Sequence, residues 1–173
     1  MSYPDFVIES WIVGFIDGEG CFCVSFTEKA NLSLGIEVRP SFSVSQKKHS
    51  IGALKKIEDY FQCGGIRFCK KDGTNKYEVR NFKDLTTQII PFFKNYSLFT
   101  QKQNDFALFL EICSLIKQNQ HLSKTGLIQI IDLAYEMNQA GTRKRKKEEL
   151  LALLERNTYQ KTSSPKILGK LNV

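Results

Sequence analysis

Apolar residues near the N-terminus recur every three or four positions, and the pattern then changes to strict alternation. The first spacing predicts a helix with one apolar face, running from about Phe6 to Gly20. The alternation predicts two half-buried strands, 21–28 and 36–45, joined by a turn. Pro40 interrupts the second strand and has no N–H to donate, so we expect it at a sheet edge or a bulge.

The same two periodicities continue along the rest of the chain. They predict a helix over 50–61, two strands on either side of a hairpin signal at 72–75, and then four more helices. The expected bounds are 66–71 and 76–81 for the strands and 84–94, 102–118, 124–139 and 148–156 for the helices. The order is that of an α+β fold, an αββαββα core with extra C-terminal helices. We expect one domain over residues 1–156 and a disordered basic tail over 157–173.

One face of the predicted antiparallel sheet is polar and rich in basic residues, while the opposite face is apolar and suits packing against helices. Such a face can lie along a DNA groove, where base edges offer hydrogen-bond donors and acceptors. An ordinary solvated surface is the alternative. The residues that we expect to contact DNA from this face are Ser25, Thr27, Lys29, Glu37, Arg39, Ser41, Ser43, Arg67, Cys69, Lys71, Lys76, Glu78 and Arg80.

Composition excludes several classes of protein. With 42% hydrophobic and 25% charged residues the chain is typical of a globular domain. No apolar run approaches the roughly 18–20 residues of a membrane span, so we expect no membrane partner. The N-terminus lacks the features of a secretory signal or a transit peptide. The five cysteines form no C-x-x-C pair, which predicts reduced thiols and no zinc site.

The net charge of +7 is unevenly placed. Residues 1–141 carry 16 basic and 15 acidic groups, a net charge of +1, whereas residues 142–173 carry 9 and 3, a net charge of +6. A basic segment on a nearly neutral body is typical of phosphate contacts. Taken alone it is a weak signal, because basic C-termini are often merely solvated.

The segment IVGFIDGEG, residues 12–20, carries the strongest indication of function. It resembles the nine-residue signature of the LAGLIDADG homing endonucleases. Gly14, Asp17, Gly18 and Gly20 match the signature outright, and Glu19 occupies its acidic eighth position. The resemblance extends over nearly the whole chain.

The physical chemistry of this segment is consistent with the resemblance. Gly14 and Gly18 are four residues apart and share one helix face, where the absence of side chains lets another backbone come close. Each glycine costs a helix roughly 1 kcal/mol relative to alanine, so a close approach is the simplest reason for two of them. Glu19 follows at the negative end of the helix dipole, which favours a cation. A helix cap with Gly20 in the left-handed conformation is the alternative.

The resemblance implies a curved antiparallel sheet that sits on DNA as a saddle. It also implies metal-dependent, site-specific cleavage of both strands across the minor groove, leaving short 3′ overhangs and promoting intron homing. Members with a single motif pair their signature helices across a two-fold axis, so we expect a homodimer and a long pseudo-palindromic target. The residues expected at the dimer interface are Trp11, Gly14, Phe15 and Gly18.

The resemblance further implies roles for individual residues. Glu19 and the carbonyl of Gly18 would bind the metal, and Glu19, Gln46 and Lys102 would be catalytic. In some members the lysine lies two residues earlier, where this chain has Thr100. Ser50 stands where a basic residue is common, so Lys47, Lys48 or His49 would complete a basic pocket instead. Asp17 is expected to be a structural acid that supports the dimer interface, and the residues expected to contact the DNA backbone are Thr142, Arg143, Lys144 and Arg145.

The expected cofactor is Mg²⁺, with Mn²⁺ able to replace it and Ca²⁺ binding without cleavage. The expected partners are double-stranded DNA, a second copy of the chain and also intron RNA. Genes of this type typically lie inside organelle introns, so we expect an organelle-encoded protein of a chloroplast or mitochondrion. Two alternatives stay open. One is an intron RNA maturase or a non-cleaving DNA-binding protein of the same fold, and the other is a dimeric protein that binds no nucleic acid.

Overall fold

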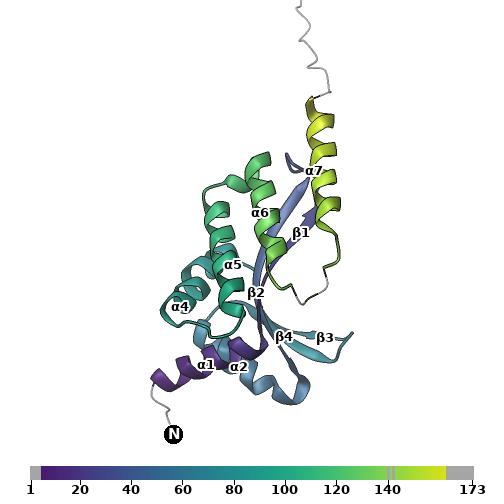
Figure 1. Ribbon diagram of the computed structural model, residues 1–173. Helices are drawn as coiled ribbons and strands as arrows, with labels where there is room; N and C mark the ends of the chain where they lie inside the picture. The colour runs from purple at the N-terminus through teal and green to yellow at the C-terminus, as the bar shows by residue number, and fades with distance from the viewer. Residues whose placement is uncertain (1–4, 140, 142, 163–173) are drawn as a thin grey trace, which may run out of the picture.

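The computed structural model describes residues 5–139, 141 and 143–162. Helices and strands alternate along the chain in the expected order (Figure 1). The strands are β1 (Gly20–Glu28), β2 (Ile36–Lys47), β3 (Gly65–Cys69) and β4 (Thr74–Val79). The helices are α1 (Asp5–Glu19), α2 (Ile51–Phe61), α3 (Phe82–Asp84), α4 (Ile90–Asn95), α5 (Lys102–Lys117), α6 (Lys124–Glu136) and α7 (Lys147–Thr162), with shorter helical turns η1 (Lys48–Ser50), η2 (Leu85–Ile89) and η3 (Gln120–Leu122). Within these ranges no helix is long and apolar enough to cross a membrane.

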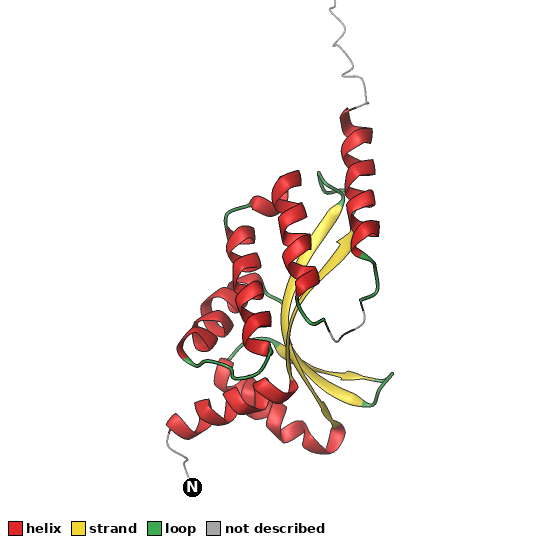
Figure 2. Cartoon of the chain, in the orientation of Figure 1, coloured by secondary structure: helices red, strands yellow, loops and turns green. Residues whose placement is uncertain are grey.

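The four strands form one antiparallel sheet in the order β1-β2-β4-β3. The sheet is bent, and its concave side opens between the β3–β4 hairpin and the loop that joins α6 to α7 (Figure 2). Pro40 pairs with Val24 of β1, but the ladder between β2 and β4 begins only at Phe42. Pro40 therefore lies where β2 has a ladder on one side only, which confirms the expected sheet edge.

Two hydrophobic clusters hold the fold together. The larger one fills the space between the sheet and the helices α1, α2, α4 and α5, and the ring of Phe22 packs on four other phenylalanines within it. The smaller cluster joins α6 and α7 to the far ends of β1 and β2. Its buried side chains are Ile36, Leu127, Ile131, Leu150, Leu153 and Leu154. The C-terminal helix is thus part of the packed domain, because burying apolar side chains stabilises the contact.

The observed bounds correct the expected tail and the expected helix at 84–94. Helix α7, expected to end at Arg156, runs to Thr162, and Asn157 Nδ2 donates to the carbonyl of Leu34 at 3.3 Å. Residues 157–162 therefore continue the domain, and the rest of the expected tail lies outside the described residues. The helix expected over 84–94 is divided into α3, the π-helical η2 and α4.

The β3–β4 turn lies two residues earlier than the sequence predicts. Cys69 pairs with Thr74, so Lys71, expected on a strand, lies in the turn. The Asp72 carboxylate accepts hydrogen bonds from the backbone N–H and the hydroxyl of Thr74, at 3.3 and 2.6 Å, and Gly73 takes a φ of 63°. These bonds close the turn at this position, because an aspartate side chain can replace a backbone partner and glycine tolerates positive φ.

Candidate functional site

The signature helix runs into the sheet without an intervening loop. Helix α1 ends at Glu19 and β1 begins at Gly20. A Cβ atom on Gly20 would lie 2.5 Å from Ile16 Cγ2 and 2.7 Å from the Ile16 carbonyl oxygen, so this position admits glycine alone. Gly20 is not among the glycines with positive φ in the described chain, which rules out the left-handed cap. Glycine is required here by close packing.

Glu19 is exposed at this junction and makes no hydrogen bond or ion pair with any described residue. Gly18 beside it is also exposed, and a Cβ there would meet nothing within 4 Å. A carboxylate that the fold leaves unpaired is available to a cation or another molecule. Its place at the C-terminal end of a helix adds the negative end of the helix dipole.

Asp17, two residues earlier, is fully engaged within the chain. Its carboxylate accepts hydrogen bonds from the backbone N–H of Phe99 (2.8 Å), the backbone N–H of Thr100 (3.1 Å) and the hydroxyl of Thr100 (2.7 Å). Burial alone would raise the pKa of Asp17, but these hydrogen bonds outweigh it and the pKa lies below its usual value. Asp17 therefore fixes the loop before α5, a structural role inside the chain.

This loop delivers Lys102 to the end of α1. Lys102 is the first residue of α5, and its ammonium group donates to the carbonyl oxygen of Gly20 at 2.5 Å. The hydroxyl of Thr100 is bonded to Asp17. Between the two positions that the family resemblance left open, Lys102 is the one that brings a lysine next to Glu19.

Gln46 reaches the same region through the register of the sheet. Gly20 pairs with Val44, so Gln46, two residues further along β2, lies level with the end of α1, and its side chain is partly exposed. The neighbouring basic residues point elsewhere or into solvent. The Lys47 ammonium donates to the Asp72 carbonyl at 3.2 Å, while Lys48 and His49 are exposed in η1. Among the described residues, none of these three side chains makes a hydrogen bond or ion pair with the end of α1.

The two faces of α1 differ in what covers them. Ile12, Val13 and Ile16 are buried in the main core. On the outer face Trp11 and Phe15 stack at a centroid distance of 5.2 Å and remain partly exposed. A Cβ on Gly14 would meet nothing within 4 Å, as at Gly18. The four residues expected at a dimer interface therefore share one face of α1, on which Trp11 and Phe15 are partly buried against the main core and Gly14 and Gly18 are exposed.

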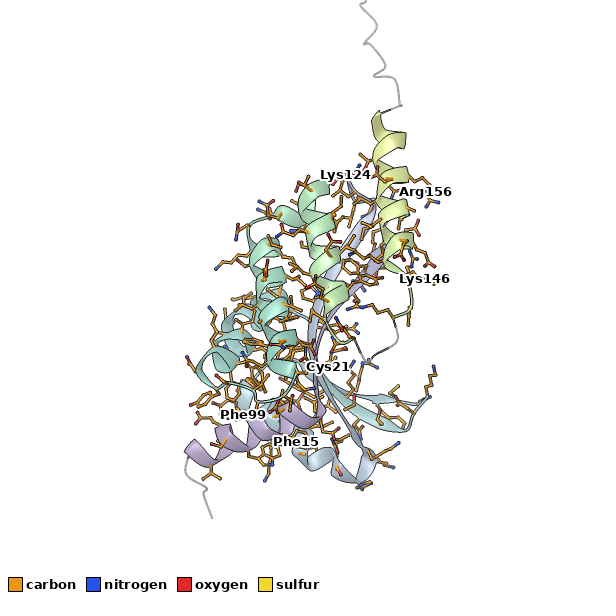
Figure 3. The ribbon with its side chains drawn as sticks, in the orientation of Figure 1. Phe15, Cys21, Phe99, Lys124, Lys146 and Arg156 are labelled. Carbon is orange, nitrogen blue, oxygen red and sulfur yellow. The ribbon has the colours of Figure 1, made fainter. Side chains whose placement is uncertain are left out.

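Sequence reasoning missed Phe99, whose side chain is 89% exposed although its backbone is bonded to Asp17. Figure 3 labels Phe99 and Phe15 on neighbouring parts of the molecule. The linker of residues 96–101 contains two adjacent apolar residues, Leu98, which is buried, and Phe99, which is exposed, and the sequence alone does not distinguish them. A large exposed apolar side chain is informative when it lies near another uncovered apolar surface.

The polar face of the sheet is basic, but several of its charges are paired within the chain. Glu37 pairs with Arg39 at 2.7 Å and with Lys29 at 3.9 Å. Glu78 pairs with three basic side chains at 3.4 Å or less. Ser43, expected on the exposed surface, is only 4% exposed and is a correction to that expectation. Its place between β1 and β4 leaves a small side chain no access to solvent.

The loop after α6 is anchored by Asn138. This residue takes a φ of 52°, its backbone N–H donates to Asp105 Oδ1 at 2.9 Å, and its Nδ2 donates to the carbonyl of Phe22 at 2.7 Å. Between this loop, β1 and the start of α5 lies an open cavity of about 880 Å³, and Lys102 is among the residues that line it. The loop therefore flanks the polar face of the sheet at the level of Lys102.

Arg143, expected to contact the DNA backbone, is bound inside this loop. It donates to the carbonyls of Ala134 and Met137 at the end of α6, and its guanidinium lies 4.6 Å from the centre of the Tyr135 ring. Satisfying free carbonyls at a helix end is a structural role. Among the other expected contacts, Lys144 is exposed, Arg145 pairs with Glu28 at 3.6 Å, and Thr142 lies outside the described residues.

The oxygen donors at the end of α1 can supply part of the coordination shell of Mg²⁺, with the remaining positions left to water and substrate. No group of three or more His, Cys, Asp or Glu side chains that could hold a metal occurs in residues 5–139, 141 and 143–162. Glu19 with the Gly18 carbonyl supplies hard oxygen donors from one side. This matches Mg²⁺, which is usually held by one or two carboxylates, with waters and substrate phosphates completing its shell. All five cysteines are free, as the sequence predicts.

Comparison with known proteins places the chain in a family. The family model described as LAGLIDADG endonuclease matches residues 12–113. A curated relative, "Probable intron-encoded endonuclease 2" of Neurospora crassa, is 34% identical over 124 residues, which cover 72% of this chain and 26% of that protein. The chain thus spans about a quarter of the length of this relative.

Solved structures agree with the fold. The homing endonuclease I-TnaI is 32% identical with a TM-score of 0.77, over 91% of this chain and 99% of that one. The archaeal intron-encoded homing endonuclease I-Vdi141I, solved in complex with DNA, is 28% identical with a TM-score of 0.81, over 90% of this chain and 99% of that one. I-SmaMI, solved on an uncleaved DNA target in the presence of calcium ions, is 32% identical with a TM-score of 0.76, over 86% of this chain and 49% of that one. The αββαββα core, the sheet and the family match agree, and the chain belongs to the LAGLIDADG endonuclease family.

Proposed function

We propose that this chain is a homing endonuclease that cuts both strands of a long, pseudo-palindromic DNA site and leaves short 3′ overhangs, which promotes intron homing. The observation that carries the proposal is the contrast at the end of α1. Glu19 is exposed and unpaired among the described residues, and Lys102 is held against the next residue, Gly20. The fold itself makes no use of Glu19, so the carboxylate is available for a metal and a phosphate.

We assign a separate role in cleavage to each residue of the site. Glu19 and the Gly18 carbonyl would hold Mg²⁺, and the ion would supply Lewis-acid activation of water and of the scissile phosphate. Lys102 places a positive charge where negative charge develops on the phosphate. Gln46, projecting from β2 beside the helix end, orients the attacking water. The basic pocket is completed by Lys48 or His49, because Lys47 is bonded to the turn at Asp72.

We also propose that the active form contains two signature helices packed face to face. Gly14 and Gly18 leave room for a second backbone, and Trp11 and Phe15 supply apolar surface on the same face of α1. A second copy of the chain gives a two-fold arrangement with one Glu19 for each DNA strand. Two solved structures match this chain over 99% of their own length, which supports a subunit of this size.

The proposed cofactor is Mg²⁺, with Mn²⁺ as a substitute and Ca²⁺ as an ion that permits binding but no cleavage. The calcium-containing complex of I-SmaMI with uncleaved DNA supports this order. The relatives named as intron-encoded support a gene inside an intron, and we place the protein in a chloroplast or mitochondrion. Intron RNA is a further partner that the exposed basic side chain of Lys144 would suit.

Selection from a duplex library tests the proposal. The purified chain is incubated with long random-sequence duplexes in Mg²⁺, and the ends of cut molecules are sequenced. The same library is then incubated in Ca²⁺ and bound molecules are recovered. We expect one pseudo-palindromic site from both selections and cut ends only with Mg²⁺. A site that is bound but never cut would favour a maturase or a non-cleaving DNA-binding protein. Equal recovery of all duplexes at every salt concentration would exclude nucleic-acid recognition.

A further inference from the structure

One carboxylate on the polar face of the sheet is placed unlike any other there. Glu78 lies in β4 between Ser43 of β2 and Gly65 of β3. Its two cross-strand neighbours therefore have very small side chains or none, which leaves room for longer side chains to reach the carboxylate. The Glu78 side chain is only 9% exposed, although it lies on the face opposite the helices.

Three basic side chains fill that space. Glu78 pairs with Arg80 at 2.9 Å, with Lys76 at 3.2 Å and with Arg67 at 3.4 Å. Burial by itself would raise the pKa of Glu78, but Lys76 and Arg80 outweigh this and the pKa lies below its usual value. The carboxylate is thus ionised at neutral pH. The cluster of four residues keeps a net charge of +2 around a buried negative centre.

Each of the two arginines contacts Glu78 with only some of its guanidinium nitrogens. Arg80 uses Nε and Nη2 on the two oxygens of Glu78, at 2.9 and 3.1 Å. Arg67 uses only Nε. Each guanidinium therefore binds Glu78 with its inner side and keeps N–H groups at its outer end. The side chains of Arg67 and Arg80 are 52% and 62% exposed, so these outer ends face solvent.

Glu78 itself is in no position to read a base. Both of its oxygens accept from arginine or lysine, and its side chain is nearly covered. Glu37, the other acid on this face, differs in both respects, because its side chain is 32% exposed and its one close partner is Arg39. An outward-facing guanidinium, in contrast, offers the paired donors that fit O6 and N7 of guanine in the major groove.

We propose that Glu78 is a positioning residue that fixes Arg67 and Arg80 as guanine-reading groups on the β3–β4 part of the sheet. This inference rests on the proposed function and adds a base preference to it. Holding the guanidinium planes before DNA arrives lowers the side-chain entropy that binding must cost. The target should then carry guanine in each half-site at the positions beneath these two arginines.

Base-preference profiles test the inference. The wild-type chain, Arg67→Lys and Arg80→Lys are each used to select bound duplexes from a random-sequence library in Ca²⁺. Lysine keeps the charge but lacks the rigid planar fork of N–H donors that Glu78 can hold in one orientation, so each variant should lose guanine preference at its own position by about tenfold or more. Glu78→Gln should lose preference at the same positions as the two lysine variants, with the other positions unchanged.

Glu155→Gln is the matched control, because it removes the charge of an ion-paired carboxylate, bonded to Lys124 at 2.7 Å, that has no proposed contact with DNA. Both acid variants change the net charge by +1, and only Glu78→Gln should lose the guanines. Retention of the full guanine preference in Glu78→Gln would overturn the inference, as would a wild-type site without guanine at the positions that Arg67→Lys alters. If the wild-type chain binds no duplex, the proposed function fails as well, which is a different result. Thermal unfolding of every variant checks the fold. If Glu78→Gln is unstable, Glu78→Asp takes its place, because aspartate keeps the charge but shortens the reach to Arg67 and Arg80, and it should lose guanine preference at the same two positions.

Discussion

The last turns of α1 have one side whose groups are buried or hydrogen-bonded within the chain and one side whose groups have no such partners among the described residues. On the first side, Ile16 is buried and Asp17 accepts three hydrogen bonds from the loop before α5. On the second side, Gly14 and Gly18 have open space around them, and Glu19 is unpaired among the described residues. Both sides belong to the same nine-residue signature.

This difference separates folding from function within one motif. Every group on the first side has a partner inside the chain, so its chemistry is explained by stability. The second side contains glycines that weaken the helix and an acid that gains nothing from the fold. The groups that make no contact within the fold are the ones to which the proposed function assigns a second subunit, a metal ion and DNA. Substitutions on the two sides should therefore have opposite kinds of effect.

The largest effect is expected for Glu19→Gln. Loss of a metal ligand should slow cleavage by about 10³-fold or more, because the metal accounts for several kcal/mol of transition-state stabilisation. The melting temperature should not change, since the side chain is exposed and makes no contact with the described chain. Cleavage of the selected duplex at saturating protein, together with binding in Ca²⁺, measures both parts. Glu111→Gln, an exposed acid on α5, is the control for the change in charge. Cleavage at the wild-type rate by Glu19→Gln would remove Glu19 from the site.

The next effect is expected for Gly14→Leu. A leucine on the outer face of α1 meets no atom of the chain itself at Cβ, so the isolated subunit should be at least as stable as wild type. A leucine there would obstruct the packing of a second α1 at a cost of about 1–3 kcal/mol, which weakens self-association by about 5- to 150-fold.

Sedimentation over a range of protein concentrations measures that association, and urea denaturation measures stability. Gly52→Leu makes the same change at an exposed glycine of α2, where a Cβ would also meet nothing within 4 Å, and serves as the control. Unchanged association of Gly14→Leu would mean that another surface joins the subunits.

The smallest effect is expected for Asp17→Asn. The amide keeps one acceptor but loses the charge that strengthens the bonds to Phe99 and Thr100, at a cost of about 1 kcal/mol in the free energy of unfolding. Folding lowers the pKa of Asp17, so its carboxylate stabilises the fold above the ordinary aspartate pKa, and this contribution is lost as the pH falls through the lower folded value. Urea denaturation should therefore show a difference from wild type near neutral pH that disappears in strong acid. A difference that grows on acidification would contradict this account.

The fold was largely predictable because hydrophobic spacing repeats over whole elements. The alternation along 21–28 and 36–45 is confirmed by the register of β1 and β2, and Pro40 lies at a sheet edge as expected. The β3–β4 turn was predicted two residues late, since its position depends on hydrogen bonds that Asp72 makes to Thr74. Periodicity specifies which residues share a face, whereas the end of a strand depends on local bonds of single side chains.

The candidate site was predictable only where the signature fixes it. The motif located Glu19 and the open face of α1, but charge alone gave no indication that Arg143 would bind the carbonyls at the end of α6. A basic residue in a loop reads the same in the sequence whether its partner is a phosphate or a backbone carbonyl. The pairing of Glu78 with Arg67 and Arg80 was equally hidden, because these residues meet only through the register of β3 and β4.

Ile16 leaves no space for a Cβ atom on Gly20, so the end of α1 packs directly against the start of β1. Because α1 and β1 are joined without a loop, we expect a rotation of α1 to change the direction of β1 as well. Under the proposed function, a substitution that changes the position of the sheet in the DNA groove will therefore also move the Glu19 carboxylate relative to the phosphate that is cut. Redesign of the target preference would need to preserve the angle between α1 and β1, and variants that bind a new site well but cut it slowly are the natural outcome when it is disturbed.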